Sequence, residues 1–211
     1  MKEAQRSQAL QDGTEAEYGD KASRVFRVLL APGKDKRPET WYKIAKEAET
    51  AYGWTHSILS RLQDKGYIKG TKILDPEALF RTWLARPRHR KYREYHIKKP
   101  VDFLSLDHEP EYAVTTYFAE EVVGAYLFPR YLDLYVEKKQ TKYWHDQVTS
   151  RGYAGKGNVR LLLDEPHVFY GTRSVKGRRI VSIQQLILDL LAEGAECAEA
   201  AQLLIGRYYD E

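Results

Sequence analysis

The chain has 211 residues, of which 43% are hydrophobic and 12% aromatic, a composition typical of globular rather than disordered proteins. No apolar run approaches the roughly 18–20 residues that a membrane-spanning helix needs, and the N-terminus lacks the apolar segment of a secretory signal. We therefore expect a cytoplasmic protein with no membrane partner. The single cysteine, Cys197, can form neither an intramolecular disulfide nor a zinc-finger site by itself.

The net charge of +4 hides an asymmetry between the two halves of the chain. Residues 1–99 contain 22 Lys and Arg against 13 Asp and Glu, a balance of +9. Residues 100–211 contain 12 against 17, a balance of −5. Such asymmetry indicates that one half of a chain faces a polyanion. On charge alone, a solvated basic surface without a partner is equally compatible.

The first predicted helix follows a polar segment, residues 1–19, that has no apolar periodicity and that we expect to be disordered. Asp20 or Ser23 can cap this helix, and an apolar stripe covers residues 25–30. Ala31-Pro32-Gly33 ends the helix, because proline cannot continue the backbone hydrogen bonds.

Two more helices are predicted, one from Thr40 to Ala48 and one from Trp54 to Lys65. The apolar residues of the first have the i, i+3, i+4, i+7 spacing of an amphipathic helix. The inward face of the second consists of Ile58, Leu59 and Leu62, and Gly66 ends it. A short hairpin with the basic tip Lys69-Gly70-Thr71-Lys72 follows, and Asp75-Pro76-Glu77 begins a fourth helix.

The order helix, helix, turn, helix, basic hairpin is that of a winged helix-turn-helix domain, which we assign to residues 20–86. In this fold the second helix braces the third, which lies in the major groove of DNA. We expect the outward side chains of the third helix to meet base edges, with Arg61 as the main reader of guanine: Thr55, His56, Ser57, Ser60 and Arg61. We expect Lys43, Lys65, Lys69 and Lys72 to contact phosphates.

The segment 87–99 is predicted to be a basic linker, or alternatively the first basic element of a second domain. Its cations Arg88, Arg90 and Lys91 are further candidates for phosphate contacts. Strand and helix patterns then alternate over residues 100–211, which predicts a C-terminal domain with a mixed α/β sheet. The fold class expected for the whole chain is α+β with two domains.

Two groups of motifs resemble the AbiEi-type antitoxin regulators of type IV toxin–antitoxin systems. In the first half these are residues 55–62 (THSILSRL), 65–68 (KGYI) and 74–83 (LDPEALFRTW). In the second half they are residues 111–115 (EYAVT), 131–136 (YLDLYV), 157–162, 168–171 and 181–190. The resemblance covers about residues 20–208. It rests on the order of the motifs along the chain more than on any single motif.

The resemblance implies a DNA-binding repressor of its own operon, acting at inverted repeats in double-stranded DNA. It also implies a cognate nucleotidyltransferase-like toxin, which an antitoxin of this type counters without an obligatory complex. A homodimer would suit a repressor of palindromic operators. The C-terminal domain would then serve as an antitoxin, dimerisation or regulatory domain.

A metal-dependent nuclease is the main enzymatic alternative, because Asp133 and Glu137-Lys138-Lys139 resemble the acidic residue and E-x-K motif of restriction-type endonucleases. The spacing weakens it, since Asp133 and Glu137 would be about 13 Å apart on one strand at ~3.3 Å per residue. Another acid, such as Asp102, Asp107 or Glu111, would have to converge on them. We expect an exposed strand edge here instead.

A protein-interaction module that does not bind DNA is the other alternative, since three short helices and a hairpin also serve that purpose. The six histidines show no metal-ligand spacing, and Gly152-x-x-Gly155-Lys156-Gly157 lacks the phosphate-binding loop pattern. We predict no catalytic residues, no metal and no cofactor, and therefore no enzyme.

Overall fold

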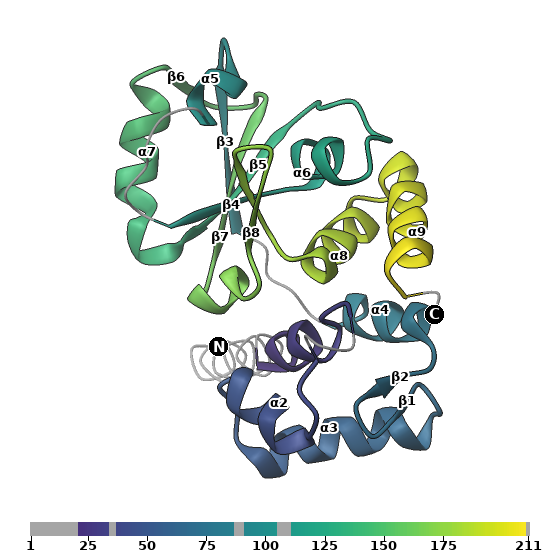
Figure 1. Ribbon diagram of the computed structural model, residues 1–211. Helices are drawn as coiled ribbons and strands as arrows, with labels where there is room; N and C mark the ends of the chain where they lie inside the picture. Colours follow the sequence, from purple (N-terminus) through teal and green to yellow (C-terminus); the bar gives the residue numbers. More distant parts are fainter. Residues whose placement is uncertain (1–20, 34–36, 87–90, 105–110, 210–211) are drawn as a thin grey trace, which may run out of the picture. The chain divides into compact units, whose positions relative to one another are not determined.

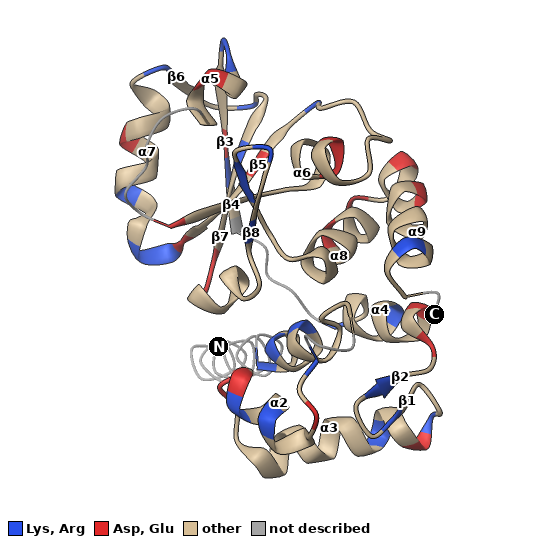
Figure 2. Ribbon diagram, viewed as in Figure 1, with Lys and Arg blue, Asp and Glu red and all other residues tan. Residues whose placement is uncertain are grey.

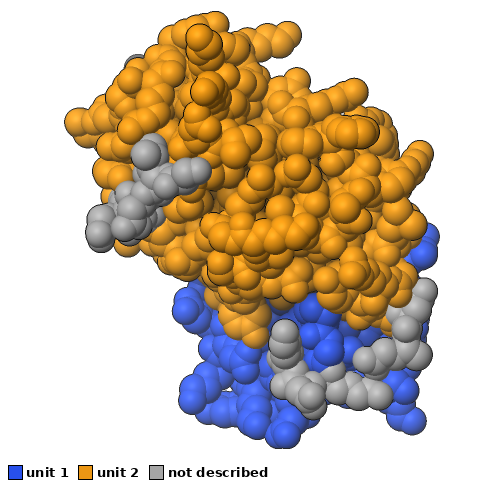
Figure 3. Space-filling model, turned by 45° about the horizontal axis from the view of Figure 1, so that its top comes forward, with its two compact units in different colours: residues 1–89 blue, residues 90–211 orange. Residues whose placement is uncertain are grey.

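The computed structural model describes residues 21–33, 37–86, 91–104 and 111–209, and its fold is mixed α+β, as the sequence predicts (Figure 1). The chain divides into two compact units, residues 1–89 and residues 90–211, which Figure 3 shows in different colours. No helix within the described ranges is long and apolar enough to cross a membrane. The segment 1–19, predicted to be disordered, lies outside the described residues.

Unit 1 contains helices and one two-stranded hairpin, in the predicted order. Residues 21–29 are helical. The remaining elements are α2 (Trp41–Glu47), α3 (Tyr52–Asp64), β1 (Ile68–Lys69), β2 (Lys72–Ile73) and α4 (Pro76–Leu84).

Local sequence explains where these helices begin and end. The Thr40 hydroxyl accepts a hydrogen bond from the Lys43 amide at 3.2 Å, and the Asp75 carboxylate accepts one from the Ala78 amide at 2.8 Å. Such N-caps contribute about 1 kcal/mol each. Gly66 follows α3 with φ +75°, a conformation that glycine adopts without strain.

The core of unit 1 is centred on Trp83 of α4. Its ring is fully buried and stacks on Phe26 at 5.8 Å and on Phe80 at 6.4 Å. Ile44 of α2 and Leu59 of α3 are also completely buried. Each helix of unit 1 therefore contributes a large apolar side chain, which fixes α3 on a rigid support.

Unit 2 is built on a seven-stranded sheet with the strand order β6-β3-β7-β5-β4-β9-β8. The pairs β5–β7 and β4–β9 are parallel and the other pairs are antiparallel. The strands are β3 (Lys91–Ile97), β4 (Tyr112–Thr115), β5 (Leu132–Glu137), β6 (Gly152–Ala154), β7 (Val159–Asp164), β8 (Arg173–Val175) and β9 (Arg178–Ile180).

The segment 87–99 is not a linker over its described part, because residues 91–97 form strand β3. This strand lies between β7 and the short edge strand β6, and it pairs with both. Tyr95 and Ile97 are buried, two residues apart, as expected for a strand with one covered face. The Lys and Arg residues of the segment concealed this alternation. Of the two alternatives, a basic first element of the second domain is therefore the correct one.

Strand β5 also differs from the expectation of a half-buried strand with an exposed edge. It lies between β4 and β7, and residues 132–136 are all buried. A strand with neighbours on both edges and helices on both faces buries polar side chains too, which is how Asp133 comes to lie in the interior.

Helices cover both faces of this sheet (Figure 1). On one face lie α5 (Pro100–Leu104) and α7 (Thr141–Thr149), where His145 Nδ1 is 3.0 Å from the Tyr95 hydroxyl. On the other lie α6 (Thr116–Val123) and α8 (Ile183–Glu193). The Asp189 carboxylate of α8 accepts hydrogen bonds from Thr115 at 2.6 Å and Tyr135 at 3.0 Å. Helix α9 (Ala195–Tyr209) packs on α8.

Candidate nucleic-acid interface

Helix α3 has one buried and one exposed face. Its buried residues are Thr55, Ile58, Leu59 and Leu62, at helical spacing i, i+3, i+4 and i+7. Of the predicted base-reading residues, His56, Ser57 and Arg61 are exposed and Ser60 is half-buried. All four carry hydrogen-bonding groups, so the exposed face of α3 is polar along its length.

Thr55 does not belong to this exposed face, contrary to the sequence prediction. Its side chain is completely buried, and its hydroxyl lies 2.7 Å from the Thr50 hydroxyl. The helix begins at Tyr52 rather than at Trp54, and Thr55 lies three, four and seven residues before Ile58, Leu59 and Leu62, which puts it on the inward face. Thr55 therefore supports the turn between α2 and α3 instead of contacting a base.

We expect the substitution Thr55→Val to lower the free energy of unfolding by about 0.5–1.5 kcal/mol, because it removes the hydrogen bond between the two hydroxyls and leaves Thr50 only its 3.5 Å contact with the Ala45 carbonyl. Thr55→Ser, which keeps the hydroxyl, should have a smaller effect. Urea unfolding monitored by tryptophan fluorescence measures both. A Thr55→Val protein with unchanged stability would contradict the structural role assigned here.

His56 is held in place by its neighbours. Its ring lies edge-on to Trp41 of α2 at 5.0 Å and to Tyr52 at 5.8 Å. Its Nδ1 is 3.3 Å from the Ser60 hydroxyl, one turn further along α3. These contacts restrict the rotamers of an exposed side chain, which lowers the entropy lost when it binds a ligand.

The tip of the β1–β2 hairpin is tied to both neighbouring helices. The Gly70 carbonyl accepts a hydrogen bond from Trp41 Nε1 at 2.8 Å, and the Gly70 amide donates one to Gln63 Oε1 at 2.9 Å. Gly70 has φ +61°, which favours glycine at this turn. The hairpin is therefore fixed beside the flank of α3 that carries His56. The sequence prediction did not include Trp41 or Gln63 in this role, because only the fold brings them together.

The hairpin places two lysines opposite each other. Lys69 and Lys72 are register partners in the antiparallel pair, and both are exposed. Like charges directly opposite each other on neighbouring strands are destabilising. A polyanion would relieve this repulsion, so the arrangement favours an anionic ligand at the hairpin.

Two arginines are also near each other at the opposite flank of α3. Arg61 is exposed, and its side chain makes no hydrogen bond or ion pair with any described residue. The Arg86 guanidinium lies over the ring of Phe26 at 5.3 Å. Burial and the nearby charge of Arg61 both lower the pKa of Arg86 from its ordinary value. The electrostatic potential around Arg61 is therefore positive.

The other residues predicted to contact phosphates differ in the partners that their side chains already have. Lys43 forms an ion pair with Glu39 at 2.8 Å, and Glu39 raises the pKa of Lys43. The Lys65 ammonium lies 5.9 Å from the centre of the Tyr67 ring. Both lysines are exposed. Arg88 and Arg90 lie outside the described residues, and for Lys91 only the backbone, in β3, is described.

The described residues of unit 1 carry an excess of positive charge, as a DNA-binding domain needs. Within residues 21–33 and 37–86 there are twelve Lys and Arg against six Asp and Glu. Figure 2 shows blue residues on α2 and on both strands of the hairpin. Of these cations, Lys43 and Lys46 of α2 and Lys69 of β1 lie on elements that pack on α3.

The candidate nuclease residues lie in unit 2, and their contacts are structural. Asp133 accepts hydrogen bonds from Arg160 Nε at 2.5 Å and Nη2 at 2.6 Å, and another from the Thr116 hydroxyl. Glu137 forms an ion pair with Lys139 at 2.6 Å. Among the described residues, no three His, Cys, Asp or Glu side chains come together in a way that could hold a metal ion. Neither Asp102 nor Glu111 joins Asp133, while Asp107 lies outside the described residues.

Burial raises the pKa of Asp133, whereas Arg160 and Thr116 act in the opposite direction. For Arg160, burial lowers the pKa, but the hydrogen bonds and charges of Asp133 and Glu193 outweigh it and the pKa is raised. The guanidinium therefore stays charged, and its two hydrogen bonds hold the Asp133 carboxylate in an ion pair.

Comparisons of the chain with protein-family models, with curated proteins and with solved structures found no match.

Proposed function

We propose that the chain is a sequence-specific transcriptional regulator that binds double-stranded DNA through a winged helix-turn-helix in unit 1. One observation carries the proposal. The exposed polar face of α3 is held rigidly beside a hairpin whose two lysines oppose each other. A polar helix face reads base edges, and adjacent cations bind phosphates.

The base-reading residues in this proposal are His56, Ser57, Ser60 and Arg61, with Thr55 removed from the predicted set. The phosphate contacts are Lys43, Lys65, Lys69 and Lys72, which lie on elements adjoining α3. Arg88, Arg90 and Lys91 stay predicted phosphate contacts.

The biological role that we propose is that of an antitoxin-type autorepressor in the cytoplasm. The similarity of the sequence motifs to AbiEi-type regulators supports it. The regulator would bind inverted repeats as a homodimer and would counter a nucleotidyltransferase-like toxin without an obligatory complex. Two-fold symmetric proteins match palindromic operators, which supports the dimer.

The proposal predicts salt-dependent binding to the DNA upstream of the chain's own gene. If the four lysines each neutralise one phosphate, log K should fall with log salt with a slope of about −3 to −4. Fluorescence anisotropy between 50 and 200 mM salt measures this slope for the upstream duplex and for a scrambled duplex of equal length. Equal affinity for the two duplexes would contradict a sequence-specific regulator.

A matched pair of variants tests whether unit 1 carries the binding. Lys43 and Lys142 are both exposed lysines in an ion pair with an acid four residues away. Lys43→Ala should make the salt slope shallower by about one, because one phosphate contact is lost. Lys142→Ala, on α7 of unit 2, should leave the slope unchanged. The reverse result would place the duplex-binding surface elsewhere.

A further inference from the structure

Helix α8 covers only part of the sheet in unit 2. On the α8 side, Tyr135 of β5 contacts Gln185 and Asp189. Beyond β7, Tyr92 and His96 of β3 and Tyr153 of β6 are exposed on the same face, and Glu94, between Tyr92 and His96, is half-buried opposite Arg160. Tyr92 is 54% exposed, Tyr153 is 60% exposed, and His96 is exposed as well. We call these three residues the aromatic platform.

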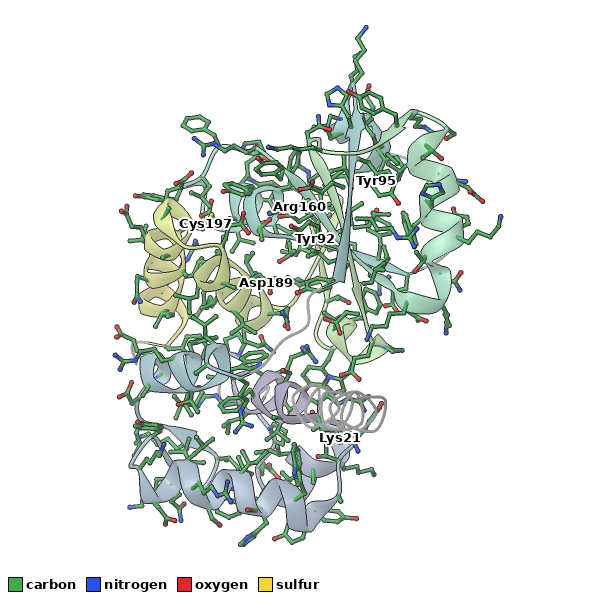
Figure 4. The ribbon with its side chains drawn as sticks, turned by 180° about the vertical axis from the view of Figure 1, so that it is seen from behind. Lys21, Tyr92, Tyr95, Arg160, Asp189 and Cys197 are labelled. Carbon is green, nitrogen blue, oxygen red and sulfur yellow. The ribbon has the colours of Figure 1, made fainter. Side chains whose placement is uncertain are left out.

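The members of the aromatic platform share one face of adjacent strands. His96 and Tyr153 are register partners, and their rings stack at 5.2 Å with an angle of 28° between the planes. Tyr92 lies four residues from His96 on β3, hence on the same face and about 13 Å away. Figure 4 shows Tyr92 on the side of the sheet that carries Arg160 and Tyr95 on the side of α7. The guanidinium of Arg160 lies 4.8 Å from the centre of the Tyr131 ring.

A glycine-rich segment, strand β6 and the turn that follows it (residues 152–157), packs closely on β3. A Cβ atom on Gly152 would lie 1.9 Å from the His96 carbonyl oxygen, and one on Gly157 would lie 2.2 Å from that of Tyr95. The Asn158 side chain accepts a hydrogen bond from the Ile97 amide at 3.0 Å and donates one to its carbonyl at 2.9 Å. Only glycine permits this close backbone approach, so the two glycines let this segment lie directly on β3.

Three cations flank the platform strands in the sequence, although residues 100–211 as a whole carry an acidic balance: Lys98 is two residues after His96, and Arg151 and Lys156 lie on either side of β6. Lys98, Arg151 and Lys156 are all exposed. Neither Lys98 nor Lys156 forms an ion pair with a described residue, and Arg151 bonds only to uncharged oxygens of Gln147 and Ser150. An exposed aromatic surface with unpaired cations at its border matches a polyanion that has flat apolar groups.

We propose that the aromatic platform binds single-stranded nucleic acid. Bases would stack on Tyr153 with His96 and on Tyr92, and phosphates would meet Lys98, Arg151 and Lys156. A duplex hides the faces of its bases within the stack, whereas a single strand offers them. This site is separate from the duplex-binding surface proposed for unit 1, and it does not depend on that proposal.

The test measures the binding of the full chain to labelled 12-nucleotide oligo(dT) and oligo(U) by fluorescence anisotropy. Tyr153→Ala and Tyr92→Ala should each weaken binding about tenfold, because each removes a stacking surface. Tyr153→Phe should retain the affinity, since the ring remains. Phe128→Ala is the matched control, because Phe128 is an 87% exposed aromatic residue outside the platform.

The variants also separate this site from unit 1. Tyr153→Ala should leave duplex affinity unchanged, and Arg61→Ala should leave oligonucleotide affinity unchanged. Tighter binding of oligo(U) than of oligo(dT) would identify RNA as the ligand, and the opposite order would identify DNA. The proposal is wrong if the chain binds neither oligonucleotide, or if Phe128→Ala weakens binding as much as Tyr153→Ala does.

Discussion

The substitution Arg160→Met is expected to lower the free energy of unfolding by about 3–5 kcal/mol at neutral pH. The side chain of Asp133 is 1% exposed, and Arg160 supplies two of its hydrogen bonds. Removing one partner of a buried ion pair leaves the other charge uncompensated, which costs more than the pair itself contributes. Glu193, at 3.0 Å from Arg160, loses its partner as well.

The stability deficit of this variant should shrink as the pH falls. Burial raises the pKa of Asp133, and the opposing effect of Arg160 disappears in the variant. A carboxyl group whose pKa is higher in the folded state destabilises the fold only where it is charged. The variant therefore regains stability as Asp133 becomes protonated, and the full deficit is present above the raised pKa.

Urea unfolding at pH 7 and at pH 4.5 measures both effects. Arg130→Met is the control, because Arg130 pairs with Glu196 at 2.9 Å but is 67% exposed. Exposed pairs of this kind contribute about 0–1 kcal/mol. Adding Asp133→Asn to Arg160→Met should restore much of the loss, since the buried charge is gone. Equal deficits in the two arginine variants would show that the buried pair has no special role.

The second large effect is expected for Arg61→Ala, which should reduce affinity for the preferred duplex about 5- to 150-fold. This range corresponds to the roughly 1–3 kcal/mol by which a bidentate arginine–guanine contact discriminates between bases. Arg61 is exposed and without a partner among the described residues, so the guanidinium needs to break no existing bond. Affinity for unrelated duplexes should change little.

Selection from a pool of randomised duplexes gives the base preference of each variant. Arg61→Ala should lose the preference at one position of each half-site, whereas Lys69→Ala should weaken binding to all sequences alike. Arg81→Ala, an exposed arginine on α4, serves as the control. An unchanged preference in Arg61→Ala would remove this residue from the base-reading set.

The sequence predicted the helices and hairpin of unit 1 because their signals are local. Thr40 and Asp75 cap the helices that follow them, and Gly66 ends α3, as their chemistry indicates. Thr55 was assigned to the wrong face although it continues the spacing of Ile58, Leu59 and Leu62. Its hydroxyl suggested exposure, but a neighbouring hydroxyl satisfies it inside the fold.

The parts that the sequence did not reveal depend on contacts between distant residues. Strand β3 is recognisable only with β6 and β7 beside it, because four of its seven residues are charged or are histidine, two are tyrosine, and only Ile97 is aliphatic. The tie between Trp41, Gln63 and Gly70 joins three elements and has no local signature. The burial of Asp133 likewise follows from the position of β5 between β7 and β4. The hydrophobic pattern of the sequence does not reveal that position.

The place of β3 in the sheet determines where the chain can be divided. A fragment that began at residue 100 would contain the acidic half of the sequence but would lack the strand between β6 and β7. The edge of β7 would then expose unpaired amides and carbonyls, which invites pairing with other chains. Residues 91–97 are therefore inseparable from the fold that follows them, and any independently folding second half has to include them.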